Sequence, residues 1–156
     1  MPVMLADADI ARLLRERKVL QTDVWKQAVP KPKRGHKESE VSLKGDGGSE
    51  FRLIMRESMF TPLDFSVILA YLPPKTNELF RLYRCNGKSH EHTNKIERET
   101  FYGFHVHMAT ERYQALGLDE DAYAKPAAHY SDFHGALGHL LDQCGFVRPS
   151  EGLFGR

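Results

Sequence analysis

The middle of this chain, between residues 41 and 108, is a series of short segments with strand-like patterns separated by turn signals. Phe51-Arg-Leu-Ile-Met alternates apolar and polar residues, as a half-buried strand does. Phe65-Ser-Val-Ile-Leu-Ala-Tyr-Leu is apolar at odd-numbered and at even-numbered positions, which predicts a central strand covered on both faces. Turn signals such as Pro73-Pro74 and Asn86-Gly87 leave only short connections. The sequence therefore predicts an antiparallel meander of about four or five strands.

Helical periodicity flanks this region on both sides. Near the beginning, Ile10, Leu13 and Leu14 form one apolar stripe. Near the end, a longer stripe follows a capping residue, Ser131 or Asp132, and stops at Gly145. We therefore expect an α+β fold in which N-terminal and C-terminal helices pack on the antiparallel sheet.

We expect a single domain over residues 1–156, because this length is typical of one domain. Its expected parts are a helical, basic segment over 1–38, the sheet over 39–108, helices over 109–146 and a loose tail over 147–156. The net charge of +1 argues against a strongly basic nucleic-acid coat and against a polyanion mimic.

The two cysteines, Cys85 and Cys144, do not form a Cys-x-x-Cys pair, which argues against a structural zinc knuckle. Apolar runs of about 18 residues are missing, so no transmembrane helix is expected. The N-terminus lacks the pattern of a signal peptide, and we expect a reduced, cytoplasmic protein.

Two His-x-His pairs are the main indication of chemistry. His90 and His92 lie in a predicted loop, and His105 and His107 lie in the alternating segment 100–107. On a strand, residues two apart point to the same face, so His105 and His107 would stand side by side. We expect the four imidazoles to share one pocket.

Three interpretations of these histidines remain open. They are solvated polar positions on the outer face of a sheet, or they perform acid–base catalysis without a metal, or they bind a metal such as zinc. In the acid–base hypothesis, His105 or His107 is the general base and His90 or His92 the general acid, while Arg84 holds a phosphate. The sequence has no His-Glu-x-x-His motif, so the metal-free hypothesis ranks above the metal hypothesis and no cofactor is expected.

Basic residues are concentrated near the N-terminus: residues 11–38 hold nine Lys or Arg and three Asp or Glu. The stretch that follows Pro30 is either a solvated linker or a phosphate-tracking arm. Its candidate nucleic-acid contacts, together with one residue near the histidines, are Lys31, Lys33, Arg34 and Lys88.

The segments Arg84-Cys-Asn-Gly-Lys-Ser-His-Glu-His-Thr-Asn and Phe101-Tyr-Gly-Phe-His-Val-His-Met-Ala-Thr-Glu-Arg-Tyr-Gln resemble a bacterial protein family of unknown function. That family is marked by a His-Glu-His-Thr-Asn loop and a Phe-His-x-His strand, and the resemblance covers roughly residues 50–146. More distantly, the paired histidines resemble those of TumE-type toxins of toxin–antitoxin pairs. This second resemblance implies a small ribonuclease that a partner protein holds in check, with His90, His92, His105 and His107 at the matched positions.

The leading hypothesis is therefore a toxin-like, metal-independent ribonuclease of a toxin–antitoxin or phage-conflict system. Its expected partners are RNA and an antitoxin-like protein, with no membrane. A homodimer is a further expectation, because a second copy could cover the central strand. The alternatives are a protein-binding inhibitor or adaptor without catalysis, and a metal-dependent hydrolase that uses the His-x-His pairs.

Overall fold

An antiparallel sheet of seven strands forms the centre of the computed structural model, which describes residues 3–149. The strand order is β10-β9-β6-β5-β4-β3-β2. The strands are β2 (Lys31–Lys33), β3 (His36–Lys44), β4 (Glu50–Ser58), β5 (Phe65–Leu72), β6 (Phe80–Asn86), β9 (His105–Met108) and β10 (Tyr123–Pro126). The helices are α1 (Asp7–Arg15), α2 (Thr22–Gln27), α3 (Glu111–Ala115) and α4 (Phe133–Gln143). The fold is α+β, as the sequence predicts.

The sheet is larger than the predicted four or five strands. Among the added strands, β2 and β10 are short strands at its two edges. β2 contains Pro32, which suits an edge strand because proline cannot donate to a second neighbour. β10 follows α3, in a region predicted to be helical, and pairs antiparallel with β9. Both strands are defined by backbone hydrogen bonds to one neighbouring strand. Their side chains therefore show little of the alternation from which a strand is predicted.

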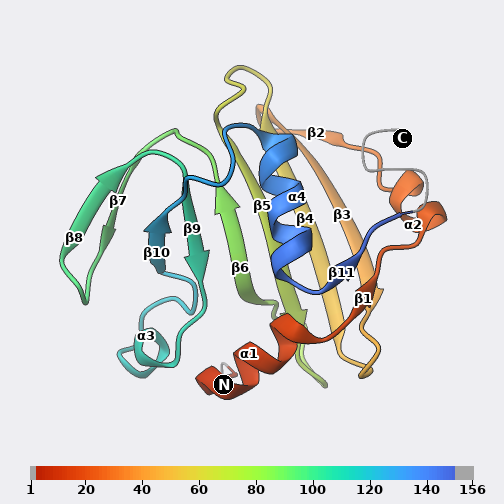
Figure 1. Cartoon of the computed structure of the whole chain (residues 1–156), viewed down its shortest axis with the longest axis horizontal. Coiled ribbons are helices and arrows are strands. Elements are labelled where there is room, and N and C mark those ends of the chain that lie inside the picture. Colours follow the sequence, from red (N-terminus) through yellow and green to blue (C-terminus); the bar gives the residue numbers. More distant parts are fainter. Residues whose placement is uncertain (1–2, 150–156) are drawn as a thin grey trace.

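Helix α4 covers one face of the sheet, lying across β5 and β6 (Figure 1). Asp132, one of the two capping residues that the sequence predicts, caps this helix by accepting a hydrogen bond from the Gly135 amide. The buried stripe of α4 comprises Phe133, Ala136, Leu137, Leu140 and Leu141. It packs on the core-facing side chains of the central strands, which include Val67, Leu69 and Cys85. The other face of the sheet has no helix packed across it among residues 3–149.

The two ends of the described chain meet beside α4. β1 (Lys18–Val19) pairs in parallel with β11 (Phe146–Val147). The Lys18 side chain is fully buried, and its ammonium group donates to the carbonyl oxygens of Leu13 and Glu16 at 2.8 Å and of Cys144 at 2.7 Å. These carbonyls belong to the C-terminal ends of α1 and α4, where the helix dipole favours a positive charge. One lysine therefore caps two helices that are remote in the sequence.

The expected single strand over residues 100–107 is instead two strands. β8 (Glu99–Tyr102) pairs with β7 (Glu91–Asn94) in a separate hairpin, and β9 begins at His105. Between them, Gly103 has a φ of 136°, a backbone conformation that favours glycine. The chain thus changes direction at Gly103, and the β7–β8 hairpin projects beyond β9 and β10 at one end of the molecule (Figure 1).

Candidate functional site

Three histidine side chains converge where the β7–β8 hairpin meets the main sheet. One ring nitrogen each of His92, His105 and His107 lies within 4.8 Å of the other two. The ring centroids of His92 and His107 are 4.8 Å apart, and those of His105 and His107 are 5.0 Å apart. His105 and His107 come from β9, whereas His92 comes from the hairpin. The expected convergence of the two His-x-His pairs is therefore confirmed for these three residues.

The two strand histidines are held by backbone carbonyls. His107 Nδ1 donates to the Asp121 carbonyl at 2.7 Å, and His105 Nδ1 donates to the Gly103 carbonyl at 2.8 Å. Because a carbonyl can only accept, Nδ1 carries the proton in both rings. The lone pair is then on Nε2. His107 Nε2 is buried and has no hydrogen-bond partner among residues 3–149, and His105 Nε2 accepts from the Asn86 amide nitrogen at 3.3 Å.

The hairpin histidine is oriented by a side-chain amide. Asn94 donates from Nδ2 to the Ala124 carbonyl at 2.7 Å and accepts at Oδ1 from the Ala124 amide at 2.9 Å, which fixes the orientation of its amide group. His92 Nε2 lies 2.8 Å from the same oxygen and must therefore donate its proton to it. The lone pair of His92 is left on Nδ1. Asn94 thus orients this ring and ties β7 to β10.

Burial keeps the two strand rings neutral. His105 is fully buried and His107 is 5% exposed. For His107, burial and the nearby Arg84 guanidinium lower the pKa to about 2. Burial also lowers the pKa of His105, which is opposed by the hydrogen bond to Gly103. The site therefore offers unprotonated imidazole nitrogens at neutral pH, the form that binds metal ions.

His90 lies at the edge of this cluster. Its ring centroid is 5.7 Å from that of His105, but the side chain is exposed and its Nδ1 bonds the Ser89 hydroxyl. It is outside the group of three whose nitrogens approach one another. His90 therefore shares the pocket region without joining the convergent set.

A network of charged side chains borders the histidines. Arg84 lies opposite His107 in the pairing of β6 with β9, so both side chains are on the face away from α4. Asp121 is buried and lies 3.3 Å from Arg81 Nη2 and 3.9 Å from Arg84 Nη1. Burial raises the pKa of the Asp121 carboxyl, and Arg81 opposes this rise. Within residues 3–149, the buried side-chain polar atoms without a partner are Arg84 Nε, His107 Nε2 and Asp121 Oδ2.

All three of these atoms therefore belong to one site. Buried polar atoms are usually satisfied, so their concentration marks this place as one where further bonding partners are needed. A hollow of about 340 Å³ opens here, and its lining includes Arg81, Arg84, His92, His107 and Asp121.

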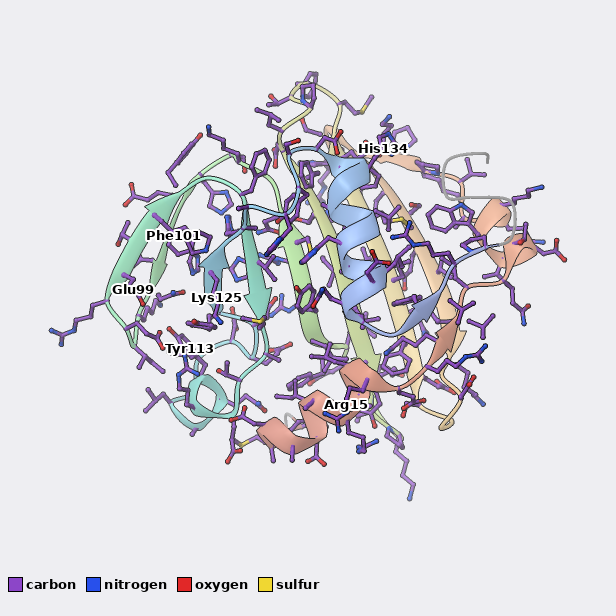
Figure 2. The ribbon with its side chains drawn as sticks, in the orientation of Figure 1. Arg15, Glu99, Phe101, Tyr113, Lys125 and His134 are labelled. Carbon is purple, nitrogen blue, oxygen red and sulfur yellow. The ribbon has the colours of Figure 1, made fainter. Side chains whose placement is uncertain are left out.

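The hairpin that carries His92 is anchored at several points. In Figure 2, Phe101 lies on the hairpin and Tyr113 lies on α3. The Phe101 ring packs 5.6 Å from His92 and 5.8 Å from His105, measured between ring centroids. The Tyr113 hydroxyl donates to the Glu97 carboxylate at 2.6 Å, in the turn of the hairpin. These contacts hold His92 over the main sheet.

The hypothesis that the histidines are solvated surface positions is wrong for His105 and His107, because the hairpin and the segment before β10 cover them. The predicted basic contacts Lys31, Lys33 and Arg34 lie at β2 and its turn, with four strands between β2 and β9 in the sheet. At roughly 4.8 Å per strand, this separation is about 24 Å. Lys88 lies nearer, in the exposed loop before His90.

Several supporting residues had no signal in the sequence. Asn94 was part of the quoted His-Glu-His-Thr-Asn pattern, but its role as the acceptor for His92 requires the hairpin geometry. Asp121 lies in the acidic run Asp119-Glu-Asp, a pattern more typical of a solvated loop than of a site. Its part in the site depends on β10 returning beside β9. Backbone acceptors such as the Gly103 carbonyl cannot be predicted from side-chain identity, because every residue has a carbonyl group.

No family model, curated protein or solved structure matches this chain. Among residues 3–149, none of the helices has the length and apolar character needed to cross a membrane. The functional assignment therefore depends on the site itself.

Proposed function

We propose that this protein is a metal-dependent hydrolase with zinc bound by His92, His105 and His107. The observation that carries the proposal is the convergence of three imidazoles that each keep one unprotonated nitrogen and donate from the other. Histidine ligands of zinc proteins are oriented in this way by a carbonyl or another acceptor on the second ring nitrogen. The ligands would be His92 Nδ1, His105 Nε2 and His107 Nε2.

Binding requires a small contraction of the cluster. Zinc–nitrogen bonds of about 2.0–2.1 Å in tetrahedral geometry bring ligand nitrogens to roughly 3.4 Å from one another. The present upper limit of 4.8 Å means that the rings would move inward by about 1 Å. Asn86 would release His105 Nε2 on binding.

Three protein ligands leave a fourth position for water, which is the arrangement of catalytic zinc sites. Three neutral imidazoles leave the full double charge on the metal, which lowers the pKa of bound water towards 7. The resulting hydroxide oxygen forms a bond to the electrophilic atom of the substrate, and the bond to the leaving group breaks. The proton lost from water ends on the leaving group.

Metal analysis of untagged protein tests this proposal. After incubation with zinc and gel filtration, the wild type should retain one zinc per chain, and His107→Gln should retain almost none. The matched control is His139→Gln, because His139 is also partly buried but lies on the α4 face, where its Nε2 bonds the Tyr83 hydroxyl at 3.1 Å. Zinc at 100 times its Kd should also stabilise the wild type by about 2.7 kcal/mol. Equal, background zinc in all three proteins would refute the proposal.

The second candidate is the metal-independent ribonuclease predicted from the sequence. The grouping of His90, His92 and His105 near Arg84 favours it, because these side chains could supply an acid, a base and a cation. RNA cleavage that persists in excess EDTA and is lost in His90→Ala would support this candidate. The expected antitoxin-like partner and the homodimer stay predictions.

A further inference from the structure

Arg84 is a guanidinium placed beside the proposed metal ligands. The pairing of β6 with β9 sets Arg84 opposite His107 and Asn86 opposite His105. Side chains directly opposite each other on one face have Cβ atoms about 4.5–5.5 Å apart. A group bound at the open metal position therefore has Arg84 within reach.

The hydrogen-bond donors of Arg84 are unused. Within the described part of the chain, its side chain makes no hydrogen bond, its Nε is buried without a partner, and its nearest carboxylate is Asp121 at 3.9 Å. Arg81, on the same strand, differs: it lies 3.4 Å from Glu120 and 3.3 Å from Asp121. A guanidinium has five donors, and buried donors are normally bonded. Arg84 is thus available to an anionic ligand.

Arg84 contributes to the lining of two hollows. The first, of about 340 Å³, contains His92 and His107 in its lining. The second, of about 360 Å³, includes His36, Arg56, Asn86 and His90 in its lining. Arg84 lines both of them. A ligand with an anionic centre and a substituent on either side would place the anion over Arg84 and one substituent in each hollow.

We propose that the substrate of the metal site is a phosphodiester whose phosphoryl group is bound by Arg84. A phosphodiester has one negative charge, two non-bridging oxygens and two substituents, so one oxygen can bind zinc while Arg84 binds the other. Carboxylic esters and amides are neutral at the bond that breaks and give the guanidinium no charge to bind. This inference rests on the proposed zinc site.

The reaction is hydrolysis. The oxygen of zinc-bound hydroxide forms a bond to phosphorus, one P–O ester bond breaks, and the leaving oxygen takes the proton that came from water. The products are a phosphomonoester and an alcohol. Arg84 stabilises the negative charge that the phosphoryl oxygens carry in the transition state.

A phosphodiester can belong to a nucleic-acid strand or to a small molecule. The phosphoryl group that Arg84 and the metal would bind is the same in both. Single-stranded RNA and bis(4-nitrophenyl) phosphate therefore serve as two arms of the test, one for the strand and one for the phosphodiester alone.

The experiment compares hydrolysis by zinc-loaded wild type, Arg84→Gln, Arg84→Lys and Arg52→Gln. Arg52 is the matched control: its side chain is 27% exposed against 26% for Arg84, it lies on the same face, and it pairs with Glu40. Each protein is assayed on bis(4-nitrophenyl) phosphate, on a 20-nucleotide RNA and on 4-nitrophenyl acetate. Zinc content and thermal unfolding are measured for each preparation.

We expect Arg84→Gln to lower kcat/KM for the phosphodiester about 100-fold, Arg84→Lys to restore part of it, and Arg52→Gln to stay within twofold. All four should retain one zinc. Faster cleavage of RNA than of the small diester would assign the strand as the source, and the reverse would assign a small phosphodiester. If zinc is bound but only the acetate is hydrolysed, or if Arg84→Gln matches the wild type, the phosphodiester assignment is overturned while the zinc site stands. If zinc is not bound, both proposals fail.

Discussion

The two faces of strands β6 and β9 differ in what their side chains do. On the face towards α4, Tyr83, Cys85 and Val106 are buried in the hydrophobic core. On the other face, Arg84, His105 and His107 are also largely buried, and Arg84 and His107 line a hollow. The first face gains stability from removing apolar surface from water. The second holds polar groups whose partners are incomplete, which costs free energy unless a ligand supplies them.

The histidines show the same contrast. On the α4 face, His139 bonds the Tyr83 hydroxyl and stacks on His129, with centroids 5.1 Å apart. Its partner is a hydroxyl, which can donate or accept, so this contact does not fix the tautomer of the ring. On the opposite face, three rings each donate to an amide or carbonyl oxygen, which fixes the unprotonated nitrogen of each ring. The comparison shows that the acceptor on one ring nitrogen, rather than the number of neighbouring histidines, decides which nitrogen can bind a metal.

The first prediction has the largest expected effect on stability. It compares two adjacent residues of β5 that lie on opposite faces of the sheet. Leu69 is fully buried on the α4 face, and Ile68 is 7% exposed beside Arg84. We expect Leu69→Ala to lower the free energy of unfolding by about 3 kcal/mol, since it leaves a cavity in the packed core. Ile68→Ala should cost about half as much, because the surrounding polar side chains can close over the gap.

Urea unfolding measures both values, and zinc content should be unchanged in both variants. An equal loss of stability in the two variants would show that the open face is packed as tightly as the core. It would contradict the proposed difference between the two faces.

A second prediction concerns acid and the metal-free protein. The His107 pKa is about 2 in the fold and about 6.5 when unfolded. The neutral ring thus contributes stability that is present above pH 6.5 and is lost as the pH falls towards 2, because only the unfolded chain takes up the proton. The loss is about 1.4 kcal/mol for each pH unit, or roughly 2 kcal/mol between pH 6.5 and pH 5.

Urea unfolding in EDTA at pH 7, 6 and 5 measures this loss. His107→Gln should reduce the slope by about 1 kcal/mol per pH unit, averaged over pH 7 to 5, while His139→Gln, on the α4 face, should change it less. Identical slopes in His107→Gln and the wild type would contradict the burial of a neutral ring at this position.

The smallest expected effect tests the orientation of His92. Asn94→Ala removes the acceptor for His92 Nε2 and both bonds to Ala124, so we expect zinc affinity to fall about 10–100-fold. Asn94→Asp keeps the oxygen that accepts from His92 and should retain most of the affinity. Competition with a chromogenic chelator measures each Kd. Equal affinities of Asn94→Ala and the wild type would mean that the ring is not positioned by this amide.

Much of the fold follows from patterns in the sequence, for identifiable reasons. The alternation in β4 and the doubly apolar β5 reflect burial of their side chains, and Asp132 and Gly145 mark the ends of α4 by their local backbone chemistry. The edge strands β2 and β10 escape prediction because backbone pairing to a neighbour defines them. The break at Gly103 escapes prediction because the alternating pattern continues through it.

The candidate site divides in the same way. The meeting of His92 with His105 and His107 was predicted from the closeness of the two pairs in the sequence. Which nitrogen of each ring is free was not predictable, because it depends on Asn94 and on the carbonyls of Gly103 and Asp121. From the sequence alone, the metal-free hypothesis ranks above the metal hypothesis. The orientation of the three rings is the observation that favours the metal hypothesis.

The lysine that caps α1 and α4 has a consequence for how the chain is made. Lys18 needs the Cys144 carbonyl, and β1 needs β11, so the cap on the C-terminal end of α1 is complete only when the chain reaches about residue 147. Other contacts of this helix end, such as Glu16 with Ser49, use residues that are made earlier. Contacts of long sequence separation close late in folding. A ribosome-stalled chain that ends before Cys144 should therefore leave the end of α1 more open to proteases than the full chain does.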